Sequence, residues 1–230
     1  MTFADQILHW IHGLKPEIVL PGDIRMMHPF RENPVVMQMV ETFYSKYYSD
    51  EDRRYVIMGI NPGRLGAGTT GIAFTDTYRM QEVCGIEVHG LKSYEPSSVF
   101  FYKLIEYLGG PVRFYHRFYI TSVSPLGFVK MNESGKWLNY NYYDSQSLEE
   151  AAIPFIEENL LIQSSFPLFR DICFVLGKKN AAHFEAINRR LRIFDMIAVL
   201  EHPRYIMQYK SRDMDKYLTS FAATLSKVLS

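Results

Sequence analysis

The sequence of 230 residues contains only two cysteines, Cys84 and Cys173. Two thiols cannot form a disulfide scaffold, a four-cysteine zinc site or an iron–sulfur cluster held by cysteine alone. Proteins built on such cross-links or metal centres are therefore excluded. The pair is typical of free thiols in a reducing compartment, which predicts an intracellular protein.

A long hydrophobic run is also lacking. No apolar segment approaches the ~18 residues that indicate a transmembrane helix. The N-terminal stretch Met1–Trp10 is interrupted by Asp5, Gln6 and His9, so it has no unbroken signal-peptide core. We therefore expect a soluble protein with no membrane partner.

Net charge is absent as well, because 25 Lys and Arg residues balance 25 Asp and Glu residues. This balance gives no global indication of an acidic partner, so any basic site must come from local arrangement. The apolar fraction of 47% excludes a disordered chain, which combines low hydrophobicity with high net charge. The length suffices for one large domain with a sizeable core or for two small domains.

What the sequence does contain is an alternation of apolar runs and helical patterns. Buried strands are predicted at Tyr55–Ile60, Phe118–Val123, Asp171–Leu176 and Ile193–Leu200. Helices are predicted at Ala4–Leu14, Pro34–Tyr48, Pro96–Leu108, Ser147–Ile162, Lys178–Arg190 and Arg212–Leu229. The alternation predicts a three-layer αβα sandwich around a short, mainly parallel four-stranded sheet.

The helix and loop boundaries carry more specific expectations. Asn33 is the predicted N-cap of the second helix, and Ser147 with Glu150 forms a predicted capping box. Lys15–His28 is expected to be a connector, and Ser124–Asp144 a long polar and aromatic loop. We expect one domain over residues 1–230, with residues 1–50 as an N-terminal helical extension packed on it.

Ligands of such sheets bind at the carboxyl ends of the strands. The loop Gly59–Phe74 follows the first strand, and its glycines at 63, 66, 68 and 71 permit close backbone approach to a ligand. It lacks the Gly-Lys-Ser/Thr of a P-loop and the order of a GxGxxG motif, so a nucleotide-phosphate site is weakly supported. A purely structural turn remains an open interpretation.

The fourth strand ends in Glu201-His202-Pro203-Arg204, where proline holds the backbone extended. A lone histidine is more often a packing or surface residue. His202 and Asn61 are nevertheless expected at the same sheet edge. No serine or cysteine in the sequence has the local pattern of an activated nucleophile, so a catalytic triad is not indicated.

Residues in these two loops resemble motifs of the uracil-DNA glycosylase superfamily. Asn61-Pro62-Gly63 is followed by Thr70-Gly71 and by Phe74, thirteen residues after Asn61, a spacing similar to the single-strand-selective monofunctional (SMUG-like) group. The mismatch-specific branch shares Gly-Ile-Asn-Pro-Gly, but its phenylalanine is one residue nearer. His202-Pro203 matches the second motif, and Val175–Lys178 resembles the strand-Gly-Lys turn between the motifs.

The resemblance implies a uracil-DNA glycosylase-like fold and hydrolysis of the N-glycosidic bond of deaminated bases during base excision repair. In this interpretation His202 donates a hydrogen bond to the departing base, and Asn61 orients the attacking water. Phe74 stacks on the extruded base. The implied base-binding residues are Gly59, Ile60, Pro62, Gly63, Thr70, Gly71, Phe74 and Ser122. No metal and no organic cofactor is implied, and two cysteines exclude the iron–sulfur branches, which use four.

Ser122 marks a departure from the family pattern. The family reads the Watson–Crick edge of uracil with an asparagine at this position, whereas the segment here is Thr121-Ser122-Val123-Ser124-Pro125. Asparagine offers a donor and an acceptor together, and a hydroxyl is shorter and less selective. Our hypothesis is a roomier pocket that also accepts deaminated purines such as xanthine or hypoxanthine.

The implied partner is DNA carrying a damaged base, single- or double-stranded, bound by a monomeric enzyme. In a bacterial cell such a protein would be cytoplasmic and nucleoid-associated. The residues expected to contact DNA are Arg64, Ser124, Lys178, Lys179, Pro203, Arg204, Tyr205, Ile206 and Met207. The segment 204–210 is expected to wedge into the duplex, or to be a buried connector. We expect cations to concentrate around Asn61, Lys178 and His202.

Two other functions stay open. A nucleoside or nucleotide hydrolase on a related fold would act on free nucleosides and would not be inhibited by DNA. The second alternative is a non-catalytic, DNA-binding member of the superfamily, and the presence of both Asn61 and His202 argues against it. The enzyme is expected to be monofunctional because no amine nucleophile is obvious at the site. Formation of a Schiff base by Lys178 or Lys179 would overturn this expectation.

Overall fold

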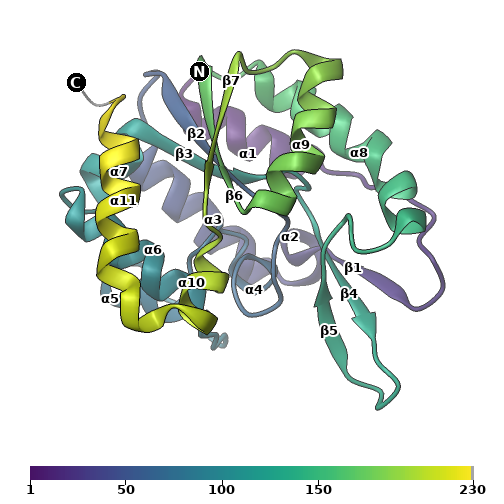
Figure 1. Cartoon of the computed structure of the whole chain (residues 1–230). Coiled ribbons are helices and arrows are strands. Elements are labelled where there is room, and N and C mark those ends of the chain that lie inside the picture. Colours follow the sequence, from purple (N-terminus) through teal and green to yellow (C-terminus); the bar gives the residue numbers. More distant parts are fainter. Residues whose placement is uncertain (229–230) are drawn as a thin grey trace.

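The computed structural model describes residues 1–228, and a four-stranded parallel sheet lies at its centre. The strand order is β3 (Phe118–Ser122), β2 (Arg54–Gly59), β6 (Leu168–Leu176) and β7 (Met196–Leu200). Helices α8 (Gln146–Ser164) and α9 (Lys178–Leu191) lie on one side of the sheet (Figure 1). Helices α6 (Pro96–Tyr107), α7 (Pro111–Arg117) and α11 (Met214–Ser226) lie on the other, which confirms the predicted three-layer fold.

The central strands could be predicted from the sequence because helices cover both faces of the sheet. All five residues of β3 are buried, and so are five of the six residues of β2. Strands buried on both faces read as continuous apolar runs rather than as alternating patterns. Their register pairs Gly59 with Ser122 and Leu176 with Leu200, so the carboxyl ends of the four strands meet at one edge.

The N-terminal helices join the same hydrophobic core. Helix α1 (Phe3–Gly13) begins with a capping box in which Thr2 and Asp5 exchange side-chain and backbone hydrogen bonds. Helix α3 (Pro34–Tyr47) begins at the predicted N-cap, where Asn33 Oδ1 accepts the backbone N–H of Val35 at 3.0 Å. Buried side chains from both helices belong to one continuous cluster with those of the sheet.

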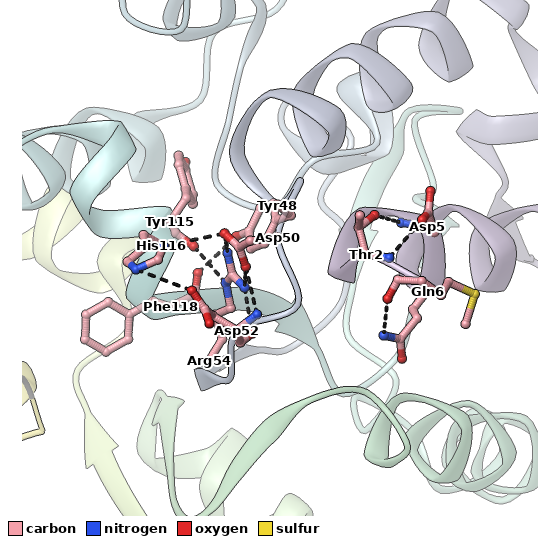
Figure 2. Close-up of polar contacts among 11 residues, drawn as sticks. Thr2, Asp5, Gln6, Tyr48, Asp50, Asp52, Arg54, Tyr115, His116 and Phe118 are labelled. Atoms are coloured by element: carbon pink, nitrogen blue, oxygen red, sulfur yellow. Dashed lines mark hydrogen bonds and ion pairs between the residues drawn. The ribbon is translucent and has the colours of Figure 1, made fainter.

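A buried arginine ties this N-terminal region to the start of β2 (Figure 2). The guanidinium of Arg54 is fully buried, forms a bidentate ion pair with Asp50 and donates to the carbonyl oxygen of Tyr115. It also lies over the rings of Phe3 and Tyr48, at 5.0 and 5.2 Å from their centroids. Arg54 holds the pKa of Asp50 down at about 2, so the pair stays charged and compensated inside the protein.

A second, antiparallel sheet corrects two of the predictions. It contains β1 (Ile24–Met27), β4 (Gly127–Met131) and β5 (Trp137–Tyr140) in the order β1-β4-β5. Strand β1 lies in the expected connector, and β4 and β5 lie in the expected long loop as a hairpin that projects from the body (Figure 1). Strands β1 and β5 are short and partly exposed, and only the first three residues of β4 are buried, so none of them carries an apolar run long enough to indicate a strand.

Several boundaries also differ from prediction. Helix α8 starts earlier, with Ser145 rather than Ser147 as its N-cap, and Glu150 bonds Gln146 instead. Strand β7 starts only at Met196, because Ile193 and Phe194 pack in the core without strand pairing. The closing helix is a short 3₁₀ turn (Ser211–Asp213) followed by α11, and residue 229 lies outside the described residues.

Short helices α2 (Pro29–Glu32), α5 (Thr77–Glu82) and α7 fill connections that the sequence analysis left unassigned. A further short helix, α4 (Ala67–Thr70), lies inside the segment that was expected to be a glycine-rich loop. The segment that was expected as a loop after His202 is helix α10 (Pro203–Tyr209), which packs against α6. Among residues 1–228, no helix combines the length and apolarity needed to cross a membrane.

Candidate active site

A cavity of about 640 Å³ opens at the carboxyl edge of the parallel sheet. Its walls come from the loop after β2, the start of α6, the end of β3, the β5 strand and helix α10. The predicted site residues that line it are Ile60, Asn61, Pro62, Gly63, Phe74, Ser122, His202, Arg204, Tyr205 and Met207. The structure therefore brings together residues that lie as far as 147 positions apart in the sequence, from Ile60 to Met207.

The amide of Asn61 is held in one orientation by the end of the hairpin. Its Nδ2 donates to the carbonyl oxygen of Tyr140 at 3.3 Å, and its Oδ1 accepts the backbone N–H of Tyr142 at 3.1 Å. An amide oxygen has two lone pairs, so one remains available for a water in the cavity. The hairpin that sequence analysis missed is thus the element that orients the predicted catalytic asparagine.

His202 caps helix α10 through its ring. Its Nδ1 accepts the backbone N–H of Arg204 at 3.1 Å. Burial and the nearby Arg204 lower the pKa of His202 to about 4, so the ring is neutral at physiological pH. A neutral imidazole that accepts at Nδ1 carries its proton on Nε2. This arrangement leaves Nε2–H as the hydrogen-bond donor of a histidine that lines the cavity.

Phe74 supplies the aromatic surface of the site. Its ring stacks on Phe101 with centroids 4.7 Å apart and lies 5.9 Å from the His202 ring. Phe74 has a positive φ of 52°, which is unusual for a bulky residue and requires support from the loop. Thr70 gives that support, because its buried hydroxyl donates to the carbonyl oxygen of Thr75 at 2.6 Å.

Two glycines shape the loop without lining the cavity. Gly71 ends α4 at φ 74°, and a side chain there would meet Phe30 and Val40 at 2.7 Å. A side chain at Gly59 would lie 3.1 Å from Ser122 Oγ and 3.3 Å from the Phe74 ring. Gly59, Thr70 and Gly71, which were expected to bind the base, are therefore absent from the cavity wall, and Gly59 lies against Ser122 and Phe74.

The expected DNA-contacting residues separate into two groups. Arg64, Lys178, Lys179, Arg204 and Tyr205 are exposed, and Met207 is half-buried at the cavity. Ser124, Pro203 and Ile206 are buried, and the hydroxyl of Ser124 donates to the carbonyl oxygen of Leu126. Burial withdraws these three side chains from direct contact with DNA. Ile206 is the core-facing residue of α10 rather than the tip of a wedge.

The expected concentration of cations is moderated by carboxylates. Lys178 Nζ lies 3.0 Å from Glu201, and Lys179 Nζ lies 3.6 Å from Asp144. The pairing with Glu201 raises the pKa of Lys178. Arg204 shares the cavity wall with a carboxylate, Glu95. The rim is therefore a set of paired charges, with Arg204 on the cavity wall and Arg64 exposed in the loop between the lining residues Gly63 and Leu65.

Sequence reasoning missed about half of the cavity wall. The additional lining residues are Leu65, Ala67, Ala73, Glu95, Pro96, Ser97, Asn139, Asn141, Gln208 and Tyr209. Asn139 belongs to β5 and its Oδ1 accepts the backbone N–H of Arg64 at 2.9 Å. Glu95 stands at the N-cap position of α6 without a side-chain cap hydrogen bond, and it comes from no motif. The available signal was chain position: Leu65, Ala67 and Ala73 lie inside the glycine loop, and Gln208 and Tyr209 lie inside the segment 204–210.

The parallel sheet and the cavity at its carboxyl edge define an α/β protein whose candidate ligand site lies between strand-end loops. Residues 45–226 match the family model of the Uracil DNA glycosylase superfamily. This match spans most of the chain, and the protein belongs to the uracil DNA glycosylase superfamily, whose members are DNA glycosylases of base excision repair.

A solved structure agrees with this assignment over the whole length. The crystal structure of wild-type SMUG2 from Pedobacter heparinus matches with a TM-score of 0.96 and 45% sequence identity, covering 99% of this chain and 98% of that chain. This similarity confirms the resemblance to the SMUG-like group and the glycosylase-like fold. No curated protein matches the sequence significantly.

Proposed function

We propose that this protein is a monofunctional DNA glycosylase that hydrolyses the N-glycosidic bond of uracil, and also of the deaminated purines xanthine and hypoxanthine. It acts as a monomer on DNA, single- or double-stranded. The observation that carries the proposal is that two suitable groups line one cavity. His202 is neutral, with Nε2–H free to donate, and the amide of Asn61 is held by the backbone of Tyr140 and Tyr142.

The chemistry follows from these groups. The extruded base stacks on Phe74, and Nε2–H of His202 donates to its carbonyl oxygen. Negative charge develops on that oxygen as the bond to C1′ breaks, so the donor stabilises the transition state more than the ground state. Asn61 Oδ1 holds the water that attacks C1′. An amide cannot accept the water proton as a carboxylate would, so Asn61 acts by positioning.

Ser122 supports the wider substrate range. Its side chain is short, and its Oγ lies at the end of β3 beside Gly59 and the Phe74 ring. The cavity of about 640 Å³ falls in the range of small-molecule sites and is large for a single pyrimidine ring. A serine there leaves room that an asparagine would fill, which favours acceptance of the two-ring purines.

Base release from synthetic oligonucleotides tests the proposal. We expect cleavage after alkaline treatment of strands that carry uracil, hypoxanthine or xanthine, in single-stranded and duplex form. Free deoxyuridine and deoxyinosine serve as the matched substrates for a nucleoside hydrolase. Release from free nucleosides that undamaged DNA does not inhibit would contradict the proposal, and tight DNA binding without release of any base would favour a non-catalytic role.

The monofunctional mechanism makes a separate prediction for borohydride trapping. Within residues 1–228 no lysine lines the cavity, and Lys178 is paired with Glu201, which keeps its amine protonated. A protonated amine cannot attack C1′. We therefore expect no covalent complex when the enzyme and uracil-containing DNA are treated with borohydride. A trapped complex that disappears in Lys178→Ala or Lys179→Ala would overturn this part of the proposal.

A further inference from the structure

Glu95 is a carboxylic acid in the wall of the cavity that the mechanism described above does not use. It is the N-cap residue of α6, and its carboxyl lies directly against Gly66. A side chain at Gly66 would come within 2.2 Å of Glu95 Oε2, so only glycine leaves room for the carboxyl. Oε1 lies 3.9 Å from the position of a Cβ on Gly63, the last residue of Asn61-Pro62-Gly63.

The two oxygens of this carboxyl differ in their surroundings. Oε2 accepts the hydroxyl of Ser98 at 3.0 Å. Oε1 is the oxygen nearer to Gly63, beside the loop that carries the predicted water-binding asparagine. The backbone of Glu95 is fixed too, because its N–H donates to Asp76 Oδ2 at 2.9 Å. The carboxyl is therefore held in place, with one oxygen available at the cavity wall.

The charged groups around Glu95 do not neutralise it. Asp76 adds negative charge from the start of α5, but it is paired with Arg79 at 2.9 Å. Arg204 of α10 is the cation that lines the same cavity. Burial raises the pKa of Glu95 to about 7 and Asp76 adds to the rise, while Ser98 and Arg204 oppose it. Near neutral pH a large fraction of the carboxyl carries its proton.

We propose that Glu95 is the general acid for purine leaving groups, and that its carboxyl proton passes to N7 of an extruded deaminated purine. This inference rests on the proposed glycosylase function and adds the catalytic group for one class of its substrates. A purine stacked on Phe74 with its imidazole edge toward Gly63 presents N7 to Glu95. Uracil has a carbon at the corresponding edge and no basic nitrogen there, so it takes no proton from this residue.

The step balances as a hydrolysis. The C1′–N9 bond breaks and its electron pair passes into the purine ring, while N7 receives the proton of the Glu95 carboxyl. The water oxygen bonds to C1′ and loses one proton to solvent, and solvent restores the proton of Glu95. The products are a neutral purine protonated at N7 and a sugar hydroxyl. A half-buried carboxyl with a pKa close to the working pH suits this role, because it holds a proton yet gives it up readily.

The test compares Glu95→Gln with the wild-type protein in single-turnover release of hypoxanthine and of uracil. Glutamine keeps the shape, accepts from Ser98 and can still donate a hydrogen bond, but it cannot transfer a proton. We expect hypoxanthine release to fall by about 10²-fold or more, the scale of general acid catalysis, with uracil release nearly unchanged. Glu106→Gln, an exposed glutamate on the same helix, is the matched control and should leave both rates unchanged.

The pH dependence gives a second, independent arm. Wild-type hypoxanthine release should decline as the pH rises through about 7, because Glu95 loses its proton, and uracil release should show no such decline. In thermal unfolding, the folded protein holds the Glu95 proton that the unfolded chain releases above its usual pKa of 4.5. The free energy of unfolding of wild type should therefore fall, relative to that of Glu95→Gln, as the pH rises from 4.5 to 7. Above pH 7 the difference should level off.

The outcomes separate the inference from the function. Equal losses for both bases in Glu95→Gln, or an unchanged rate for hypoxanthine, would overturn the inference. So would wild-type release of uracil without hypoxanthine, or a stability difference that does not change with pH. Failure of the wild type to release either base would instead contradict the proposed function itself.

Discussion

Replacing Asn61 with alanine should lower the rate of uracil release by about 10²–10⁴-fold, because the attacking water loses its positioning group. The side chain is bonded to backbone groups of Tyr140 and Tyr142, and its remaining acceptor site is the one that would hold the water. Single-turnover release from a uracil-containing strand measures the rate. A gel-shift titration with the same strand should show that DNA binding is retained.

A matched variant separates water positioning from damage to the pocket. Asn141 lines the same cavity one residue after β5, and Asn141→Ala removes an amide of the same size without touching Asn61. We expect a much smaller effect on release than that of Asn61→Ala. If Asn61→Ala binds DNA normally and turns over at nearly the wild-type rate, then Asn61 has no part in the chemistry.

Loss of the His202 donor should slow uracil release by about 10²–10³-fold, the usual effect of removing one donor to a developing oxyanion. His202→Asn is the informative variant. Asparagine is a good N-cap, so its Oδ1 can still accept the N–H of Arg204 and keep helix α10 in place. Its side chain is too short to replace Nε2–H at the base. An unchanged melting temperature with this loss of rate would assign the effect to the donor.

The protonation state of His202 adds a prediction about pH. Burial lowers the pKa of the ring to about 4, so the catalytic neutral form is already complete at pH 6 and above. Uracil release should therefore show no inflection near pH 6.5, where an ordinary histidine titrates. It should change only as the pH approaches 4 and the imidazolium forms. An inflection at 6.5 that His202→Asn removes would contradict a histidine that is neutral at physiological pH.

The lowered pKa of His202 also makes the stability of the folded protein depend on pH. Between pH 6.5 and 4 the unfolded chain protonates the histidine while the folded protein keeps it neutral. The contribution of His202 to stability is therefore present above pH 6.5 and is lost as the pH falls toward 4. Glu95 acts in the opposite direction over nearly the same range, because its pKa is raised rather than lowered. The contributions of His202 and Glu95 are separated by comparing His202→Asn and Glu95→Gln, each alone, with wild type.

The central sheet could be predicted because its strands are buried on both faces. Arg54–Gly59 and Phe118–Ser122 match the predicted runs to within one residue at each end. Their parallel order follows from the helices between them, and this order brings Asn61 and His202 to one edge. The pairing of these two residues in one cavity was therefore within reach of sequence reasoning.

The hairpin and the helix after His202 could not be predicted in the same way. Trp137–Tyr140 is partly exposed and gains its strand geometry by pairing with Gly127–Met131. Pro203–Tyr209 becomes helical because His202 caps it and Ile206 packs into the core beside α6. Both depend on partners that are distant in sequence, so local pattern carries no signal for them.

Local burial and local motifs are enough to specify the central sheet, the edge at which the cavity opens and the residue types in two of its loops. The tautomer of His202, the orientation of the Asn61 amide and the place of Glu95 at the cavity emerge only from the folded chain. Tautomer, amide orientation and pKa depend on hydrogen-bond partners and burial, and here much of both comes from segments far apart in the chain.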